Sequence, residues 1–213
     1  MKTAAAGMSG EAYAALPRGR HLLSREYVDR YQRERMARAV AELAHEEGLA
    51  GVTVTAVTAR ARISRKTFYD HFGDIEECVD HAGERAMAHL FEPAEEAGTA
   101  GSPSGETTAT TAGLEGLLEA VASEPLLAEL ALIHVPALGS RRGRWFQEIA
   151  VGAVAGLVSG GNDERAAMAE TSASAIIGVI AFRVGHGEAA RIDEMRQAVV
   201  GLGATIETAS PGA

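Results

Sequence analysis

The side chains best suited to bind another molecule are concentrated in residues 53–71, where cations and hydroxyls follow one another closely. Arg65, Lys66 and Thr67 come directly after Ser64, which is a favourable residue type for a helix N-cap. Cations in a first helical turn destabilise the helix, because that end carries the positive end of the helix dipole. Their position therefore favours an external anion, and the chemistry predicted is non-covalent recognition rather than catalysis.

Three short helices are predicted to position these side chains. A helical pattern runs over residues 25–47 and stops at Gly48. Thr53 can cap a second helix that ends near Arg62, and the third helix is expected over residues 65–71. The expected core of the unit consists of apolar residues from all three helices: Val40, Leu43, Val57, Ile63, Phe68 and Phe72. A helix-turn-helix unit of this kind presents its third helix to the major groove of DNA.

Two groups of DNA contacts are expected from this arrangement. Base edges would be contacted by the first turn of the third helix: Arg65, Lys66 and Thr67. Phosphates would be held by hydroxyl and imidazole groups around it: Thr53, Thr55, Tyr69 and His71.

The same stretch resembles a known family signature. Residues 54–72, and in particular the pattern Ser64-x-x-Thr67-Phe68-Tyr69-x-His71-Phe72, are similar to the DNA-binding signature of the TetR family of transcriptional regulators. The resemblance covers roughly residues 16–80. It implies a homodimer that binds a palindromic operator, mostly as a repressor. It also implies a variable helical C-terminal domain for dimerisation and for a small-molecule effector that releases the DNA.

Two positions depart from the family pattern. Arg62 stands where the turn between the helices usually has Gly, and a left-handed conformation there would cost on the order of 1 kcal/mol. The alternatives are a looser turn or a contact of Arg62 with DNA. Ile75 stands where the family usually has a Lys that anchors a phosphate. These departures keep open an effector-binding or interaction protein whose DNA-binding unit has decayed. A helical enzyme is the other alternative, but the sequence offers no nucleophile, acid–base pair or metal cluster to support it.

The charge of the chain is unevenly distributed. The formal net charge is −9, yet residues 17–72 carry +4 and residues 73–213 carry −13. A basic segment joined to an acidic body can bind phosphates at one end. Residues 1–24 are expected to form a flexible basic arm, in which Arg18 and Arg20 either enter the minor groove or belong to a disordered tail.

The whole chain is expected to be all-α, with the helix-turn-helix domain at residues 25–73 and a helical effector-binding and dimerisation domain at residues 74–213. A fourth helix should start after Asp74 and end near Glu92, before Pro93. The composition of residues 97–113 predicts a flexible linker. Further helices are predicted by apolar periodicity, at residues 114–123, 125–134, 138–159, 163–184 and 189–208.

The last two predicted helices are rich in small and apolar residues on more than one side. This pattern indicates either a four-helix dimer interface or a monomer core. An effector pocket is expected between the middle helices, with large apolar and aromatic candidates: Phe91, Leu118, Leu130, His134, Trp145, Phe146 and Phe182. For each of them a place in the plain core is the alternative.

Other chemistry is weakly represented. Cys78 is the single cysteine and is expected to be a small core residue rather than a redox sensor. His81 and His89 share a predicted helix face without an evident third ligand, so no metal or other cofactor is expected. The basic and aromatic run at residues 141–146 is expected to start a helix rather than to form a second nucleic-acid site. No membrane span or secretory signal is expected, and the predicted location is the cytoplasm, on the nucleoid.

Overall fold

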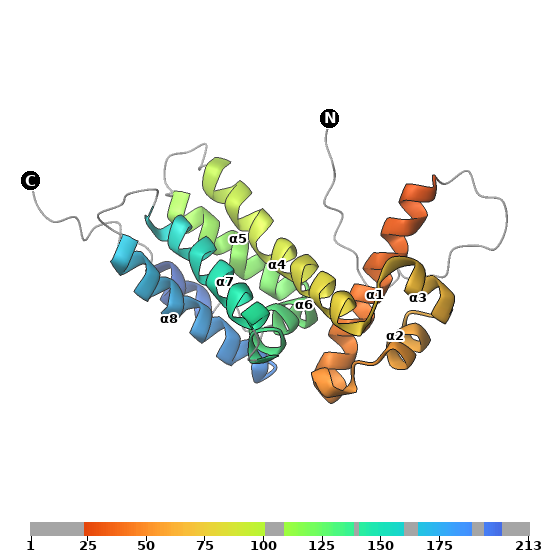
Figure 1. Cartoon of the computed structure of the whole chain (residues 1–213). Helices are drawn as coiled ribbons and strands as arrows, with labels where there is room; N and C mark the ends of the chain where they lie inside the picture. The colour runs from red at the N-terminus through yellow and green to blue at the C-terminus, as the bar shows by residue number, and fades with distance from the viewer. Residues whose placement is uncertain (1–23, 101–108, 139–140, 160–165, 189–193, 202–213) are drawn as a thin grey trace, which may run out of the picture. The chain divides into compact units, whose positions relative to one another are not determined.

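The computed structural model describes residues 24–100, 109–138, 141–159, 166–188 and 194–201. Within these ranges the regular elements are helices and no strand occurs, which confirms the predicted all-α fold (Figure 1). The chain divides into two compact units, one ending at Ala82 and the other beginning at Gly83.

The N-terminal unit contains the three predicted helices, which are α1 (Arg25–Glu47), α2 (Val54–Arg60) and α3 (Arg65–His71). α1 starts after Ser24, whose side chain accepts a hydrogen bond from the amide of Tyr27 at 3.1 Å. It ends at Gly48, which has a positive φ of 71°. A short 3-10 turn, η1 (Leu49–Gly51), leads towards α2. Local capping signals therefore explain where these helices begin and end.

The core of this unit forms around Phe68, which is fully buried. Its ring centroid lies 5.8 Å from that of Phe72, and the Phe72 ring lies 5.4 Å from that of His81 in α4 (Ile75–Ala100). The first turns of α4 therefore pack within the N-terminal unit. Five of the six predicted core residues are buried, whereas Ile63 in the turn before α3 is only half-buried.

The predictions for the end of α4 and for the linker were wrong. α4 continues through Pro93 to Ala100, although an interior proline removes one helix hydrogen bond. The next helix, α5 (Ala109–Ser123), starts five residues earlier than predicted. Of the predicted linker, residues 97–100 and 109–113 are helical, and residues 101–108 lie outside the described residues.

Close packing of α4 on α5 explains this difference. A Cβ on Gly113 would lie 3.1 Å from the carbonyl oxygen of Ala94, and one on Gly116 would lie 3.1 Å from that of Pro93. Ala94 is fully buried. The small residues that suggested a flexible linker instead allow two helix backbones to approach each other, and this burial offsets the break caused by Pro93.

The remaining helices lie close to their predicted positions. α6 (Pro125–Glu129) continues as a π-helical turn, η2 (Leu130–His134), and a 3-10 turn, η3 (Pro136–Leu138). α7 (Arg141–Ser159) and α8 (Ala166–Gly185) follow, and the two lie side by side (Figure 1). Residues 194–201 are also helical.

One stretch of α8 resembles a membrane span in composition. Among the described residues, Met168–Gly185 is long and apolar enough to cross a membrane, with a mean hydropathy of 1.3 over its 18 residues. Core helices of soluble proteins meet the same criterion, so this stretch is weak evidence for a membrane location.

Candidate nucleic-acid interface

α3 is a short amphipathic helix with one buried side and one exposed side. Ser64 caps it, because its hydroxyl accepts a hydrogen bond from the amide of Thr67 at 2.9 Å, as predicted. Phe68 points into the core, whereas Arg65, Lys66 and Tyr69 are exposed. The cationic side of α3 is therefore free of covering protein within the N-terminal unit.

The turn between α2 and α3 contains a strained residue. Arg62 has a φ of +52° and is the only non-glycine residue with a positive φ in the described part of the chain. The amide of Arg62 donates to the carbonyl of Ala59 at 3.2 Å, and the amide of Ile63 donates to that of Thr58 at 3.0 Å. These two bonds define a Schellman motif, in which glycine is the favoured residue at the position of Arg62. The sharp turn is thus formed without that glycine.

A buried arginine supports the same turn. Arg35 of α1 is 7% exposed, and its guanidinium donates a hydrogen bond to the carbonyl of Ala61 at the end of α2. The guanidinium also lies 5.9 Å from the centre of the Tyr31 ring. A cation at the carboxyl end of a helix is stabilised by the helix dipole. Sequence reasoning missed this residue, since nothing local links positions 35 and 61.

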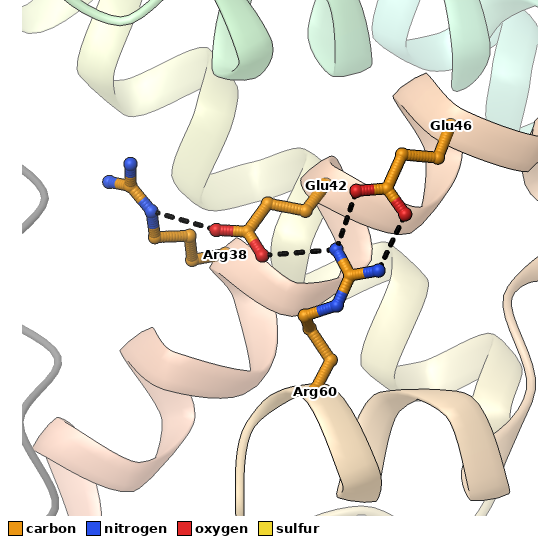
Figure 2. Close-up of polar contacts among 4 residues, drawn as sticks. All are labelled: Arg38, Glu42, Glu46 and Arg60. Atoms are coloured by element: carbon orange, nitrogen blue, oxygen red, sulfur yellow. Dashed lines mark hydrogen bonds and ion pairs between the residues drawn. The ribbon is translucent and has the colours of Figure 1, made fainter.

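A second arginine fastens α2 to α1 (Figure 2). The Arg60 guanidinium donates to Glu42 at 3.2 Å and to both carboxylate oxygens of Glu46, at 3.0 and 2.5 Å. Arg38 donates to the other oxygen of Glu42 at 3.2 Å. The hydrogen bond from Arg60 lowers the pKa of Glu46, and the two carboxylates raise the pKa of Arg60. Two of the cations counted in the basic segment are therefore already paired within the protein.

The three threonines among the predicted contacts have hydrogen-bond partners within the protein. Thr53 caps α2, since its Oγ1 accepts from the amide of Ala56 at 3.2 Å. Thr55 Oγ1 accepts from the Arg65 guanidinium at 3.3 Å. The Thr67 hydroxyl lies 2.9 Å from the hydroxyl of the α3 cap. Thr53 and Thr55 are exposed and Thr67 is half-buried, so the structure places these residues around the start of α3.

Tyr69 and His71 differ in their surroundings. Tyr69 is 55% exposed, with its ring edge-on to the buried ring of Phe68. His71 is half-buried, and its Nε2 lies 2.7 Å from the side-chain oxygen of Gln32 in α1. Burial is the main cause that lowers the pKa of His71, and the positive charge of Arg33 lowers it further. His71 thus joins the end of α3 to α1.

The remaining candidates are Arg18, Arg20, Ile75 and the cap of α4. Arg18 and Arg20 lie outside the described residues. Ile75 starts α4 and is half-buried. The predicted cap of α4 is confirmed, because Asp74 accepts from the amide of Glu77 at 2.8 Å. Glu77 in turn accepts from the amide of Gly73 at 2.6 Å, so the start of α4 is fixed directly after α3.

The seven predicted effector residues differ in their burial. Four are in the core, with exposures between 0 and 5%: Phe91, Leu118, Leu130 and Phe146. His134 is half-buried in the π-helical turn, with its Nε2 3.0 Å from Glu129. Trp145 and Phe182 are exposed, by 46% and 61%. A groove of about 550 Å³ runs between α7 and α8, and none of the seven residues lines it.

Neither redox nor metal chemistry gains support. Cys78 is completely buried, and burial raises the pKa of its thiol to about 12. The reactive thiolate is therefore rare at neutral pH. Within the described residues, no group of three or more His, Cys, Asp or Glu side chains could hold a metal ion.

Comparisons with known proteins agree with this geometry. Residues 38–82 match the family model of bacterial regulatory proteins of the tetR family. A TetR-like transcriptional regulator from Rhodococcus sp. RHA1 has a similar structure, with a TM-score of 0.65 and 20% identity. The match covers 88% of this chain and all of that one. A TetR-family regulator from Marinobacter aquaeolei VT8 gives a TM-score of 0.65 at 14% identity, over 85% and 97% of the two chains.

A third solved structure, the dihydroxyacetone kinase operon activator DhaS, matches with a TM-score of 0.59 at 16% identity, over 83% of this chain and 96% of that one. No curated protein sequence matches the chain. The structural matches show the fold, while the family model covers the helix-turn-helix itself. Residues 38–82 are thus similar to the DNA-binding part of the tetR family, and the chain as a whole shares the fold of these solved structures.

Proposed function

We propose that the protein binds a pseudo-palindromic DNA operator as a homodimer, with one α3 in the major groove of each half-site. The observation that carries this proposal is the exposed cationic side of α3, which presents Arg65 and Lys66 opposite the buried Phe68. A two-fold dimer requires a two-fold operator, so the half-sites should lie about 10 bp apart or slightly more.

The individual DNA contacts that we propose are made by side chains at the surface around α3. Arg65, Lys66 and Thr67 would contact base edges, and Tyr69 with its exposed hydroxyl would contact a phosphate. Thr53 and Thr55 flank the same surface from α2, and Arg18 and Arg20 would add minor-groove contacts. His71 requires a different account, because a phosphate contact from its Nε2 would have to replace the bond to Gln32.

The regular turn between α2 and α3 favours an intact DNA-binding unit over a decayed one. Arg62 takes the left-handed conformation and both Schellman hydrogen bonds form, so the missing glycine does not disrupt the turn. The pairing of Arg60 with Glu42 and Glu46 keeps α2 against α1. Both features support a unit that holds α3 in a fixed orientation.

Fluorescence anisotropy with DNA from the region upstream of the gene tests operator binding. Wild-type protein should bind tightly, with an affinity that falls steeply with salt because bound cations displace counterions. Lys66→Ala should lose sequence preference, whereas the charge-matched control Arg85→Ala in α4 should not. Weak binding to any DNA, unchanged by Lys66→Ala, would contradict the proposal.

Exposed apolar side chains on α7 and α8 support the dimer. Trp145 and Ile149 of α7 are 46% and 37% exposed, and Val179 and Phe182 of α8 are 45% and 61% exposed. Large apolar residues gathered on two neighbouring helices favour a protein–protein interface. We therefore propose that the dimer contact lies on α7 and α8, so that α7 takes the place of the helix predicted at residues 189–208.

Analytical ultracentrifugation tests this interface. Phe182→Glu should convert the dimer to a monomer, because the interface would have to bury an unpaired charge. Leu138→Glu is the matched control, since Leu138 is 42% exposed but lies in η3, outside the proposed interface. A Phe182→Glu protein that remains dimeric would contradict this placement.

The regulation we propose is repression that a small-molecule effector relieves. A dimer bound at a promoter excludes the polymerase, although the similar structure DhaS is an activator by name. The buried residues Phe91, Leu118, Leu130 and Phe146 are proposed to line the effector site, which must open on binding because they are packed in the core. A thermal-shift screen tests this idea, since a ligand that binds the folded state raises the melting temperature.

A further inference from the structure

Asp70 is an acidic side chain on the exposed side of α3, and it is not among the DNA contacts proposed above. Its carboxylate pairs with the ammonium of Lys66 one turn earlier, with Nζ 2.9 Å from Oδ2 and 3.2 Å from Oδ1. The Asp70 side chain is 55% exposed and the Lys66 side chain is 85% exposed. The surface that faces DNA in the proposed function therefore presents a hydrogen-bond donor and an acceptor side by side.

Neither helix stability nor general DNA affinity accounts for this acid. Exposed ion pairs four residues apart contribute little to stability. Phosphates repel a carboxylate, so Asp70 must lower the affinity of α3 for DNA of arbitrary sequence. An acid at this place is useful where it meets a hydrogen-bond donor on a base.

A G·C base pair offers the complementary pattern. In the major groove, guanine presents the acceptors N7 and O6, and the N4 amino donor of cytosine lies next to them. The ammonium of Lys66 has three donors, while the carboxylate of Asp70 only accepts. O6 and N4 are one hydrogen bond apart within the base pair, which matches the spacing of Nζ and Oδ2 in the protein.

An A·T base pair fits less well. Adenine also places an acceptor, N7, beside a donor, N6, but it offers a single acceptor to the ammonium. The next groups across the pair are the thymine O4 acceptor and the methyl group, and neither can donate to a carboxylate.

We infer that Asp70 is a specificity-determining residue, which accepts a hydrogen bond from cytosine N4 while Lys66 donates to the guanine of the same base pair. This inference rests on the proposed function, because it requires α3 in the major groove. It assigns to each half-site one G·C pair that the two side chains recognise together.

Selection from a pool of random double-stranded DNA with the full chain tests the assignment. Half-sites bound by the wild-type protein should share a G·C pair, and changing that pair to A·T should weaken binding about tenfold. Asp70→Ala should lose most of this discrimination while binding unrelated DNA at least as well as wild type. Asp70→Asn keeps an acceptor oxygen, so it should retain more of the discrimination than Asp70→Ala.

Glu47→Ala serves as the control, because it removes an exposed acid from α1 without touching α3. It should keep the wild-type preference. If Asp70→Ala keeps the tenfold preference, or loses affinity equally for all DNA while its thermal unfolding is unchanged, the assignment is overturned and the proposed function stands. If the wild-type protein enriches no sequence, the proposed function fails and the assignment fails with it.

Discussion

Replacing Arg62 by glycine should stabilise the N-terminal unit. Arg62 holds a φ of +52° in the Schellman motif that ends α2. A residue with a Cβ in this left-handed region carries a cost of about 1–2 kcal/mol. Glycine removes that cost, but it also makes the unfolded chain more flexible, which lowers the free energy of unfolding by about 0.5–1 kcal/mol. The net expected gain in the free energy of unfolding is about 0.5–1 kcal/mol.

Arg62→Ala is the matched control, since it removes the charged side chain and keeps the Cβ. The Arg62 side chain is exposed, so alanine should change the free energy of unfolding by less than about 0.5 kcal/mol. The difference between the glycine and alanine variants then isolates the backbone contribution. For a unit of this size, about 1 kcal/mol corresponds to a melting shift of roughly 4–8 °C.

The assay must report on the N-terminal unit alone. The single tryptophan, Trp145, lies in the C-terminal unit, so its fluorescence follows the wrong part of the chain. Amide hydrogen exchange in α2 and α3, measured beside urea unfolding followed by circular dichroism, gives the local free energy. A glycine variant no more stable than the alanine variant would refute the strain argument, because the backbone would then carry no left-handed cost.

Three further predictions concern single sites. Burial lowers the pKa of His71 below 6.5, so its contribution to stability is complete above about pH 6.5 and is lost as the pH falls through the folded-state pKa. The urea midpoint of the N-terminal unit should follow this course, and a midpoint that rises on acidification would contradict it. Cys78, with a pKa of about 12, should resist iodoacetamide at pH 8 in the folded protein and react once urea unfolds it; equal rates in both states would exclude a buried thiol. Gly113→Ala should destabilise the C-terminal unit by about 1–3 kcal/mol, because the new Cβ would lie 2.7 Å from Leu157 and 3.1 Å from the carbonyl of Ala94. Tryptophan fluorescence in urea measures this loss, and an unchanged midpoint would show that α4 and α5 are not closely packed.

The sequence predicted the N-terminal unit well because its signals are local. Thr53 and Ser64 cap α2 and α3 as expected, and Phe68 and Phe72 are buried as their spacing indicates. Each of these predictions depends on residues within one or two helical turns. For Arg62 the sequence left open a left-handed turn, a looser turn or a contact with DNA, and the structure shows the left-handed conformation.

Contacts between distant residues escaped the sequence analysis. The bond from Arg35 to Ala61 spans 26 positions, and the bonds from Arg60 to Glu42 and Glu46 span 18 and 14. No periodicity or fixed spacing in the sequence indicates that residues so far apart are in contact. Arg35 and Arg60 were counted among the positive charges expected to bind phosphates. In the structure, Arg35 instead contacts the turn after α2, and Arg60 binds α2 to α1.

Composition misled the prediction where small residues pack tightly. The glycines near residue 113 suggested a linker, because a flexible segment and a close helix contact have the same residue types. In the C-terminal unit, the assignment of Trp145 and Phe182 to a pocket rested on their size and aromatic character, and it stays a prediction. Both side chains are exposed. Cores, pockets and interfaces are built from the same apolar residue types, so residue type alone does not tell which of the three an apolar residue belongs to.

The most direct test of the central claim is a footprint of the full chain on its operator with dimethyl sulfate, which methylates guanine N7 in the major groove. An α3 in each of two neighbouring major grooves should protect two groups of guanines, symmetric about a centre and about 10 bp apart. Lys66→Ala should remove protection from both groups. Guanines that stay equally reactive with and without the protein, at concentrations that saturate binding, would contradict major-groove recognition by α3.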